Sequence, residues 1–333
     1  MRLLILGGTM FLSRTVARLA VKRGHQVTAL ARGTHPVPKG VQLVTADREQ
    51  GADAYRSLLA SLADEQTWDA VLDVSRIPNQ VESAVTALST RTKHWAFVST
   101  VSVYADHSTP SGNESDQLLA EWSEDQDPLE HYGEAKVSCE KILREALSPE
   151  QLLVARPGLI CGPGDPSDRY GYWPARFARD NEPVLAPAVA ASAKTQVIDV
   201  RDFAAWLLDG MENALAGTYD VVGDEVPMQT LLGAALEASG YRGQIRLAPE
   251  EWLLEQGVNY WAGEDSLPLW LPAEAAGMFQ RDGSAARRVG LRPRPFDETL
   301  KAVLQDERSR GLTRERRAGL SAAKEKALIA ELP

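Results

Sequence analysis

Leu3-Leu4-Ile5-Leu6-Gly7-Gly8-Thr9, close to the start of the 333-residue chain, has the pattern of a buried strand that ends in a glycine turn. A continuous apolar run of this kind is typical of a strand that is covered on both faces. Residues 11–23 then show helical spacing, Gly24 is suited to end that helix, and residues 27–30 form a second apolar run. Together these elements predict a βαβ unit, whose first turn presents backbone N–H groups to a diphosphate.

The glycine turn departs from the usual G-x-x-G-x-x-G pattern of dinucleotide-binding proteins. Gly7 occupies the first position, but Met10 and Ser13 stand at the second and the third. A serine is small enough for the helix to pack closely at Ser13, whereas Met10 must turn its side chain away from the phosphates. A plain tight turn without a ligand is the alternative interpretation of this stretch.

Strands and helices continue to alternate through the first half of the chain. The further strands are expected at residues 41–44, 68–73, 94–99 and 152–156, and the further helices at residues 54–63 and 81–88. Such alternation predicts an α/β fold, with a doubly wound, Rossmann-like parallel sheet. Ligands of these sheets bind at the carboxyl ends of the strands. Five polar residues lie at such ends: Arg32, Asp47, Ser75, Ser99 and Thr100.

Residues after the second and third strands favour one nicotinamide dinucleotide over the other. Proteins that prefer NAD usually carry Asp or Glu after the second strand, where it holds the ribose 2′-hydroxyl. Ala31 stands there instead, and Arg32 offers a bidentate partner for a 2′-phosphate. Asp47 is placed to reach the adenine amino group, and Arg48 the 2′-phosphate. We therefore expect NADP(H), with NAD(H) as an alternative and a merely solvated Arg32 as another.

Composition and charge exclude several classes of function. The chain has 36 Lys and Arg against 46 Asp and Glu, a net charge of −10, which argues against nucleic acid as a partner. Cys139, Cys161 and the five histidines show no metal-ligand spacing, so neither a metal nor a disulfide framework is expected. The apolar run at the N-terminus is too short for a signal peptide, and no stretch approaches the roughly 20 apolar residues of a membrane span. We expect a soluble, cytoplasmic protein.

A second informative stretch is His131-Tyr132-Gly133-Glu134-Ala135-Lys136. Positions i and i+4 share one face of a helix, so the Tyr132 phenol and the Lys136 ammonium are expected to point into the same space. A nearby cation favours phenolate, which would let Tyr132 exchange protons at neutral pH rather than near its usual pKa of about 10. The pattern alone arises by chance in many helices, so its meaning depends on the motifs around it.

Three motifs in this order resemble the extended short-chain dehydrogenase/reductase superfamily, in its NAD-dependent epimerase/dehydratase group. The motifs are Ser99-Thr100-Val101-Ser102-Val103-Tyr104, Tyr132-Gly133-Glu134-Ala135-Lys136 and Arg156-Pro157-Gly158. The resemblance runs from Met1 to about Asp202 and departs from the family at Met10 and Ser13. By position it implies a catalytic set of Thr100, Tyr132 and Lys136.

The resemblance implies hydride transfer between a nicotinamide and a carbonyl or alcohol of a small organic molecule. Such transfer to a carbonyl builds an alkoxide, which needs a proton donor within hydrogen-bond reach. Tyr132 is expected to supply the proton, Thr100 to hydrogen-bond the same oxygen, and Lys136 to lower the tyrosine pKa and hold the nicotinamide ribose. Dehydratases of the superfamily carry Asp-Glu where this chain has Val101 and Ser102, so sugar dehydration is not expected.

Cofactor contacts are expected from fourteen positions in all: Gly7, Thr9, Met10, Phe11, Leu12, Arg32, Asp47, Arg48, Val74, Ser75, Ser99, Lys136, Pro157 and Ile160. In the family, the segment around residues 162–176 lines the substrate pocket, which implies substrate contacts from Tyr172, Trp173 and Arg176. Trp252, Trp261 and Trp270 either line the pocket or form the core of a small lobe. Residues 106–130, which hold eight Asp and Glu but no Lys or Arg, are expected to form a solvated loop or to overhang the site, where they would disfavour polyanionic substrates.

The predicted organisation is a dinucleotide-binding domain with a smaller C-terminal substrate lobe. The domain spans residues 1–165 with a returning segment at 195–225, the lobe spans 166–194 and 226–312, and residues 313–333 form a charged, solvated helix. The favoured function is an NADP(H)-dependent oxidoreductase for a small-molecule substrate, as a monomer or homodimer. One alternative is a sugar epimerase that uses NAD(P)+ transiently. The other is a non-catalytic cofactor-sensing or RNA-binding relative, disfavoured because Tyr132 and Lys136 are both kept.

Overall fold

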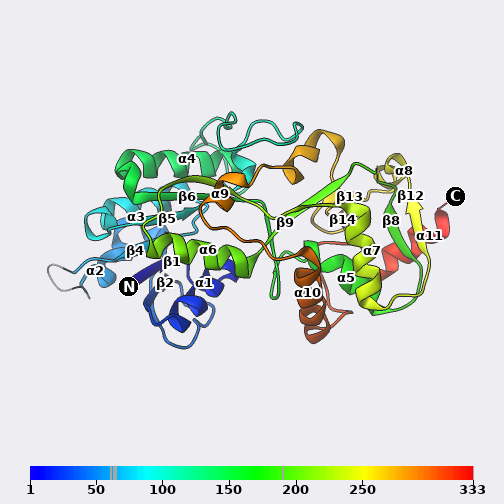
Figure 1. Ribbon diagram of the computed structural model, residues 1–333, viewed down its shortest axis with the longest axis horizontal. Coiled ribbons are helices and arrows are strands. Elements are labelled where there is room, and N and C mark those ends of the chain that lie inside the picture. Colours follow the sequence, from blue (N-terminus) through cyan, green and yellow to red (C-terminus); the bar gives the residue numbers. More distant parts are fainter. Residues whose placement is uncertain (61, 63–65, 190, 333) are drawn as a thin grey trace.

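A seven-stranded parallel sheet forms the centre of the larger of two lobes (Figure 1). The computed structural model describes residues 1–60, 62, 66–189 and 191–332. The strands of the sheet are β1 (Arg2–Leu6), β2 (Gln26–Ala31), β3 (Val41–Thr45), β4 (Ala70–Asp73), β5 (Trp95–Val98), β6 (Leu152–Pro157) and β10 (Gly217–Val221). Their order is β10-β6-β5-β4-β1-β2-β3, so the strand order reverses between β1 and β4. The doubly wound, Rossmann-like prediction is confirmed.

Helices cover both faces of this sheet, which explains the continuous apolar run in β1. Leu3 and Ile5 pack with α1 (Phe11–Lys22) and α6 (Val200–Glu212) on one face. Leu4 and Leu6 pack with α3 (Pro78–Leu88) and α4 (Tyr132–Ala146) on the other face. Because successive residues of a strand point to opposite faces, both sets must be apolar.

The helix expected at residues 54–63 differs from the prediction. A 3-10 helix, η1 (Arg48–Tyr55), comes first and is followed by the short helix α2 (Arg56–Ala60). Gly51 has φ 59 and ψ −133, a conformation that interrupts helical geometry within η1. Residues 61 and 63 lie outside the described residues.

In the part of the chain that the structure describes, the smaller lobe is built from short sheets and five helices. A three-stranded sheet joins β7 (Leu159–Cys161), β9 (Lys194–Asp199) and β11 (Glu225–Pro227), and two-stranded sheets join β8 (Val184–Pro187) to β12 (Ile245–Ala248) and β13 (Asn259–Trp261) to β14 (Ser266–Pro268). The helices are α5 (Arg169–Arg179), α7 (Met228–Ser239), α8 (Glu250–Glu255), α10 (Phe296–Arg310) and α11 (Ala322–Glu331). Trp270 is buried in the core of this lobe, Trp252 and Trp261 pack at its edge, and Trp261 also faces a cavity.

Two segments of the C-terminal half depart from the prediction. After η5 (Ala273–Phe279), the helix α9 (Ser284–Arg288) returns to the larger lobe, where Ala286 and Leu291 are buried, so residues 226–312 are not all substrate lobe. Residues 312–321 are not helical, so within the described residues α11 is what forms of the helix expected at 313–333, and residue 333 lies outside them. Gly311 (φ 100) ends α10, and arginines of the following stretch bind buried acids instead of pointing to solvent.

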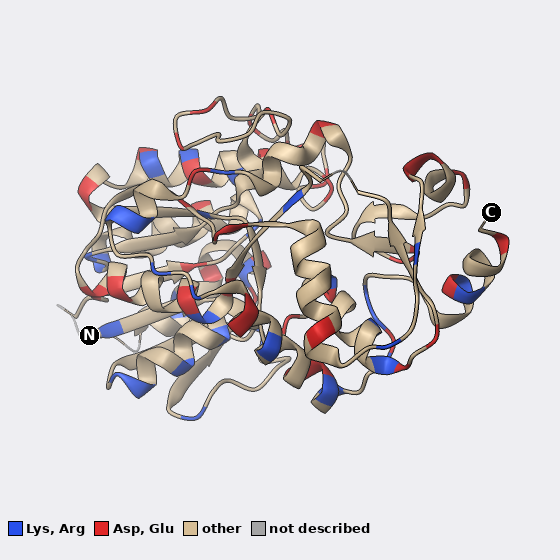
Figure 2. Cartoon of the chain, turned by 45° about the vertical axis from the view of Figure 1, so that its right-hand side comes forward, with Lys and Arg blue, Asp and Glu red and all other residues tan. Residues whose placement is uncertain are grey.

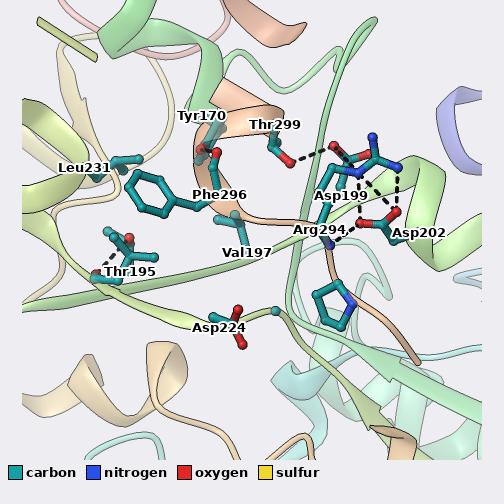
Figure 3. A pocket seen from close by; sticks show the side chains of 13 residues that line it. Tyr170, Thr195, Val197, Asp199, Asp202, Asp224, Leu231, Arg294, Phe296 and Thr299 are labelled. Atoms are coloured by element: carbon teal, nitrogen blue, oxygen red, sulfur yellow. Dashed lines mark hydrogen bonds and ion pairs between the residues drawn. The ribbon is translucent and has the colours of Figure 1, made fainter. Parts of the chain in front are cut away.

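Polar contacts join the two lobes at the start of α6 (Figure 3). Asp199 caps this helix by accepting from the backbone N–H of Arg201 at 2.8 Å, and it also accepts from the Thr299 hydroxyl at 2.8 Å. Arg294 donates to Asp202 at 2.5 Å. The space enclosed there is about 20 Å³, which is room for about one water molecule. The junction therefore serves packing and leaves the ligand sites elsewhere.

Charged residues of both signs are interspersed over both lobes (Figure 2). The acidic segment 106–130 is partly tied down, because Asp116 pairs with Arg281 at 2.9 Å and Glu114 accepts from the backbone N–H of Asp220 at 2.8 Å. Among the described residues, no helix combines the length and apolar character needed to cross a membrane.

Candidate functional site

Two adjoining cavities open where the strand order of the central sheet reverses. The first, about 560 Å³, lies over the carboxyl ends of β1, β2, β3 and β4, and we call it the groove. The second, about 430 Å³, lies between the ends of β5 and β6 and the smaller lobe, and we call it the substrate-side cavity. Val74 and Arg76 line both, so the two cavities meet just beyond β4. Ligands of doubly wound sheets bind at this place.

The glycine turn has the close approaches that a dinucleotide cradle requires. Gly7 has φ +87, and a Cβ on Gly8 would lie 2.6 Å from the Cβ of Ala29. Ser13 is buried and donates to the carbonyl of Gly7 at 2.7 Å, so a serine replaces the third glycine without opening the turn. Met10 is 52% exposed, lines the groove and gives α1 no side-chain cap, so its side chain takes none of the first N–H groups of the helix. The residues present therefore fit a diphosphate.

The residues after β2 and β3 divide into a groove wall and an internal ion pair. Arg32, Thr34 and His35 are exposed and line the groove, as does Asp47, which caps η1. The expected role of Arg48 is wrong. Its guanidinium is buried and binds both carboxylate oxygens of Asp73, at 2.9 and 3.0 Å. Asp73 is fully buried at the end of β4 and needs this counter-charge, so Arg48 is not available for a 2′-phosphate.

The Tyr132 phenol stands at the wall of the substrate-side cavity, at the start of α4. The α4 backbone approaches η3 (Val101–Val103) so closely that a Cβ on Gly133 would lie 2.4 Å from the carbonyl oxygen of Ser102. Thr100 caps η3 by accepting from the backbone N–H of Ser102 at 3.1 Å, its hydroxyl donates to the Ser102 hydroxyl at 3.2 Å, and Thr100 lines the same cavity as Tyr132. Thr100 and Tyr132 therefore present two hydroxyl groups to one space.

Lys136 does not lower the pKa of Tyr132 as expected. Burial raises this pKa above its usual value of 10, against the opposing effects of the nearby Thr100 hydroxyl and the charges of Arg76 and Arg169. The ammonium of Lys136 donates to the carbonyls of Ser75, at 2.6 Å, and of Val98. Burial also lowers the pKa of Lys136 to about 8. The cations that act on the phenol are thus two arginines that the sequence motif does not contain.

Arg169 is the most notable residue of the substrate-side cavity, and the expected substrate set does not include it. Its guanidinium lies 4.5 Å from the ring centre of Trp261, and burial lowers its pKa. Within the described residues, its buried Nε has no hydrogen-bond partner. Phe279 and Met278 also line this cavity. A cation with free hydrogen-bonding capacity beside aromatic rings suits a ligand with an anionic group and an apolar or planar part.

The expected substrate contacts from Tyr172, Trp173 and Arg176 are wrong. All three are buried in the smaller lobe, where the Trp173 indole donates to the carbonyl of Pro268 at 2.7 Å and Arg176 pairs with Glu325 at 2.5 Å. Residue 169 begins α5 and faces the cavity, while the later positions turn into the core of the lobe. The aromatic residues of this segment serve packing.

The remaining cofactor candidates divide between the two cavities. The groove is lined by Gly7, Thr9, Met10, Val74 and Ser75, and the substrate-side cavity by Phe11, Ser99, Lys136, Pro157 and Ile160. Leu12 is buried in the core below α1 and lines neither. The predicted set lacks Arg76, although it directly follows Ser75 and the strand-end rule applies to it equally. Arg169, Trp261 and Phe279 come from three distant segments and share no spacing that a sequence reveals.

The geometry defines a class of protein, the nicotinamide-dependent enzymes of the short-chain dehydrogenase/reductase type, because a dinucleotide groove adjoins a Thr–Tyr pair at the strand-order reversal. The chain belongs to the NAD dependent epimerase/dehydratase family, whose model matches residues 3–221. The predicted membership is confirmed.

Individual relatives are similar to this chain in sequence or in fold. The chloroplast stem-loop binding protein of 41 kDa b from Arabidopsis thaliana is 37% identical over 70 residues, which cover 21% of this chain and 18% of that protein. UDP-N-acetylglucosamine 4-epimerase from Bacillus cereus superposes with a TM-score of 0.69 at 16% identity, covering 96% of this chain and 100% of that one. UDP-glucose 4-epimerase from Thermus thermophilus, in complex with NAD, gives 0.64 at 19% identity, covering 92% and 99%. At these identities the two structures show a shared fold.

Proposed function

We propose that the chain is an NADP(H)-dependent oxidoreductase that interconverts a carbonyl and an alcohol on a small organic substrate, with Tyr132 as the acid/base. The observation that carries the proposal is that Tyr132 and Thr100 line the same cavity, which adjoins the groove. Two hydroxyl groups aimed at one space can bind and protonate a single substrate oxygen.

A bound nicotinamide dinucleotide supplies the hydride donor or acceptor. Because burial raises the pKa of Tyr132, the phenol is protonated at neutral pH and can donate its proton to the substrate oxygen in the reductive direction. Thr100 hydrogen-bonds the same oxygen. In the oxidative direction the phenol must first lose its proton, and the charges of Arg76 and Arg169 favour that loss.

Lys136 contributes by holding strand ends together. Its ammonium joins the carbonyl of Ser75, beyond β4, to that of Val98, at the end of β5. Both residues lie beside the cavities. We propose that Lys136 fixes the spacing of this floor and presents its remaining donor to the nicotinamide ribose.

The substrate is proposed to carry a carboxylate or a phosphate. Arg76 and Arg169 both line the substrate-side cavity, and Arg169 has an unpartnered, buried Nε within the described residues. Trp261 and Phe279 add aromatic surface. The acidic segment 106–130 does not overhang this wall as one of the expectations had it, so it gives no reason to disfavour polyanions. Among the residues that the structure describes, only Leu129 of that segment lines the groove and none lines the substrate-side cavity.

A titration tests the cofactor part of the proposal. Arg32, Thr34 and His35 line the groove beyond β2 and are proposed to hold the 2′-phosphate. Calorimetric titration of the apo protein should therefore give tighter binding of NADPH than of NADH. Equal affinities would contradict the NADP(H) preference, and no binding of either would contradict the dinucleotide site itself.

A sugar-nucleotide epimerase is the second candidate. Two observations favour it: UDP-sugar 4-epimerases share the fold over almost their full length, and two arginines line the cavity, of which Arg169 lies over the Trp261 ring. An epimerase returns the hydride to its substrate, so it would retain its dinucleotide through purification and interconvert UDP-sugars without net consumption of NADPH. The oxidoreductase would consume NADPH in proportion to product formed.

The RNA-binding alternative has one supporting observation, the 70-residue similarity to the stem-loop binding protein. The chain carries a net charge of −10 and keeps Tyr132 and Lys136 at the cavity wall. An acidic chain lacks the extended basic field that recruits the phosphate backbone of a nucleic acid. We therefore do not advance RNA binding as the function.

A further inference from the structure

Asp168 forms the junction between the cavity rim and α5, and its conformation is unusual. It has φ 60 and ψ 6, in the left-handed region that residues other than glycine seldom adopt. It occupies the N-cap position of α5, where an aspartate ordinarily accepts from the N–H groups of the first turn, yet it makes no such hydrogen bond. Its carboxylate, in a residue only 3% exposed, is used for something else.

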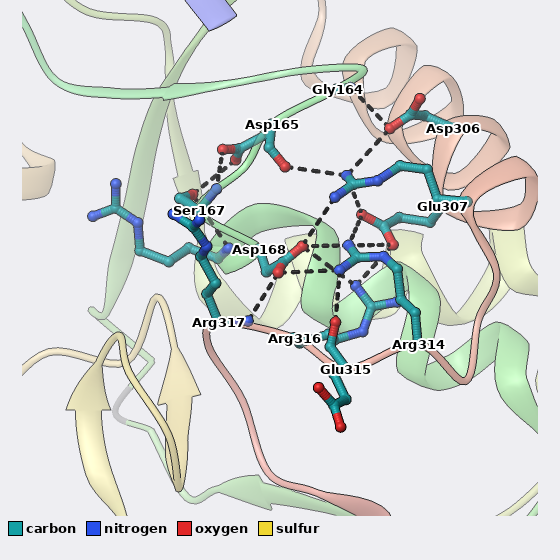
Figure 4. Close-up of polar contacts among 12 residues, drawn as sticks. Gly164, Asp165, Ser167, Asp168, Asp306, Glu307, Arg314, Glu315, Arg316 and Arg317 are labelled. Atoms are coloured by element: carbon teal, nitrogen blue, oxygen red, sulfur yellow. Dashed lines mark hydrogen bonds and ion pairs between the residues drawn. The ribbon is translucent and has the colours of Figure 1, made fainter. Parts of the chain in front are cut away.

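The carboxylate of Asp168 binds the C-terminal arm, which we define as residues 311–317 (Figure 4). Arg314 donates to it through both terminal nitrogens, one of them at 3.1 Å, and the backbone N–H of Arg317 donates at 2.9 Å. Arg310, at the end of α10, lies 3.5 Å away. Residues about 146 positions later in the chain thus bind the N-cap residue of α5.

A second buried acid completes this network. Glu307 is 2% exposed and pairs with Arg310 at 3.2 Å, Arg314 at 3.0 Å and Arg316 at 2.7 Å. A Cβ on Gly171 would lie 2.6 Å from the Glu307 carboxylate, so a glycine on α5 is what lets Glu307 approach. The two carboxylates therefore share arginines that tie the start of α5 to the end of α10.

The same network holds the rim of the substrate-side cavity. Arg310 donates to the backbone carbonyl of Asp165 at 3.1 Å, and Asp306 accepts from the backbone N–H of Gly164 at 2.8 Å. Asp165, Ser167 and Arg169 line the cavity itself. Arg169 directly follows Asp168 as the first residue of α5, so the backbone angles of Asp168 set the direction of this helix start, and with it the Arg169 side chain, relative to the rim.

We propose that Asp168 and the C-terminal arm are positioning elements that aim Arg169 over Trp261 and at the anionic group of the substrate. The proposal rests on the proposed function, in which Arg169 binds that group. Without the arm, Asp168 is free to return to an extended conformation and to cap α5 as aspartates ordinarily do. That change turns the backbone at residue 168 and withdraws the Arg169 guanidinium from the ring.

Fluorine NMR of protein labelled with 5-fluorotryptophan reports the position of Arg169 without any substrate. The Trp261 signal is assigned by its loss in Trp261→Phe, and Arg169→Gln shows its frequency without the cation. Arg314→Ala should move the Trp261 signal toward the Arg169→Gln frequency, and Arg314→Lys, which keeps a charge, should move it less. A Trp261 signal unchanged in Arg314→Ala would overturn the proposal.

Glu325→Gln is the matched control, because it breaks an equally buried ion pair that also involves α5. Glu325 and Arg176 are each 2% exposed in their side chains and lie 2.5 Å apart, but they join α5 to α11 and not to the rim. This variant should lose stability and leave the Trp261 signal in place. If it moves that signal as far as Arg314→Ala does, the arm is a general packing element and the positioning role is wrong.

Titration with inorganic pyrophosphate, in the presence of NADP+, separates the positioning role of the arm from the proposed anionic substrate. The wild type and Glu325→Gln should bind it equally, and Arg314→Ala about tenfold more weakly. If the wild type does not bind pyrophosphate and shows no anion-dependent change at Trp261, the proposed anionic substrate is wrong, while the ligand-free spectra still decide the positioning role.

Discussion

The groove and the substrate-side cavity adjoin at Val74 and Arg76, but their walls are held by different forces. Apart from the buried Arg48–Asp73 pair behind β4, the groove wall consists of strand ends and a glycine turn, fixed by parallel-sheet hydrogen bonds over an apolar core. The rim opposite it is fixed by buried carboxylates and arginines, such as Asp168 with Arg314. Loss of one neutral hydrogen bond should cost the groove wall little stability. Loss of one charge at the rim leaves its oppositely charged partners without a counter-charge and should cost more.

Tyr132→Phe removes the proposed acid/base of the substrate-side cavity and has the largest expected effect. Turnover should fall by about 10²–10⁴-fold, the usual contribution of a positioned general acid or base. NADPH affinity, measured by calorimetry, should stay within about twofold, because the phenol faces the substrate-side cavity and not the groove. Retention of most of the activity would contradict the proposed mechanism.

The pH dependence of the reaction rates of the wild type is a further test of Tyr132 as the acid/base. Because burial raises its pKa above 10, the protonated form dominates below that value. Reduction should therefore change little between about pH 6 and 8, while oxidation should rise throughout this range as more phenolate forms. Tyr219→Phe is the control for the loss of a tyrosine hydroxyl in Tyr132→Phe. In the wild type the Tyr219 hydroxyl donates to the carbonyl of Ala216, away from both cavities.

Glu307→Gln tests the charge-held wall. The substitution removes the buried carboxylate that Arg310, Arg314 and Arg316 share, so the free energy of unfolding should fall by about 3 kcal/mol. Urea unfolding followed by circular dichroism measures this loss. A change below about 1 kcal/mol would show that solvent or Asp168 compensates for the missing charge, and that the two walls do not differ as argued.

Arg32→Ala probes the groove at its outer end. The side chain is exposed, so the substitution should leave stability unchanged. NADPH binding should weaken by about 10-fold to 100-fold, the worth of a charge-assisted bidentate contact, with NADH affinity nearly constant. Parallel titrations of both cofactors measure the ratio, and equal losses for the two would contradict the assignment of Arg32 to the 2′-phosphate.

The two walls also differ in how far the sequence predicts them. Local patterns suffice for the groove, because Leu3–Leu6, Gly7 and Arg32 lie within one βαβ unit whose geometry follows from burial and spacing. Arg48 escapes this logic because its partner, Asp73, is a distant buried acid.

The substrate-side wall could not be predicted in the same way. Arg169, Trp261 and Phe279 meet only because the smaller lobe folds over the sheet, and the arginines of the C-terminal arm resemble a solvated helix until Asp168 and Glu307 are placed beside them. For the same reason the prediction that Tyr172, Trp173 and Arg176 line the pocket is wrong. A helix shows in its sequence which residues share a face, but not which face meets the cavity.

Ser13→Ala has the smallest expected effect and completes the comparison. The Ser13 hydroxyl donates to the carbonyl of Gly7 at 2.7 Å, but that carbonyl also accepts from the backbone N–H of Thr9 at 2.9 Å, so no buried acceptor is left without a donor. The free energy of unfolding should fall by about 1 kcal/mol or less, and NADPH affinity should change by less than about threefold. A decrease in the free energy of unfolding as large as that of Glu307→Gln, measured by the same urea unfolding, would contradict this. It would mean that the glycine turn depends on Ser13 as strongly as the rim depends on its charges.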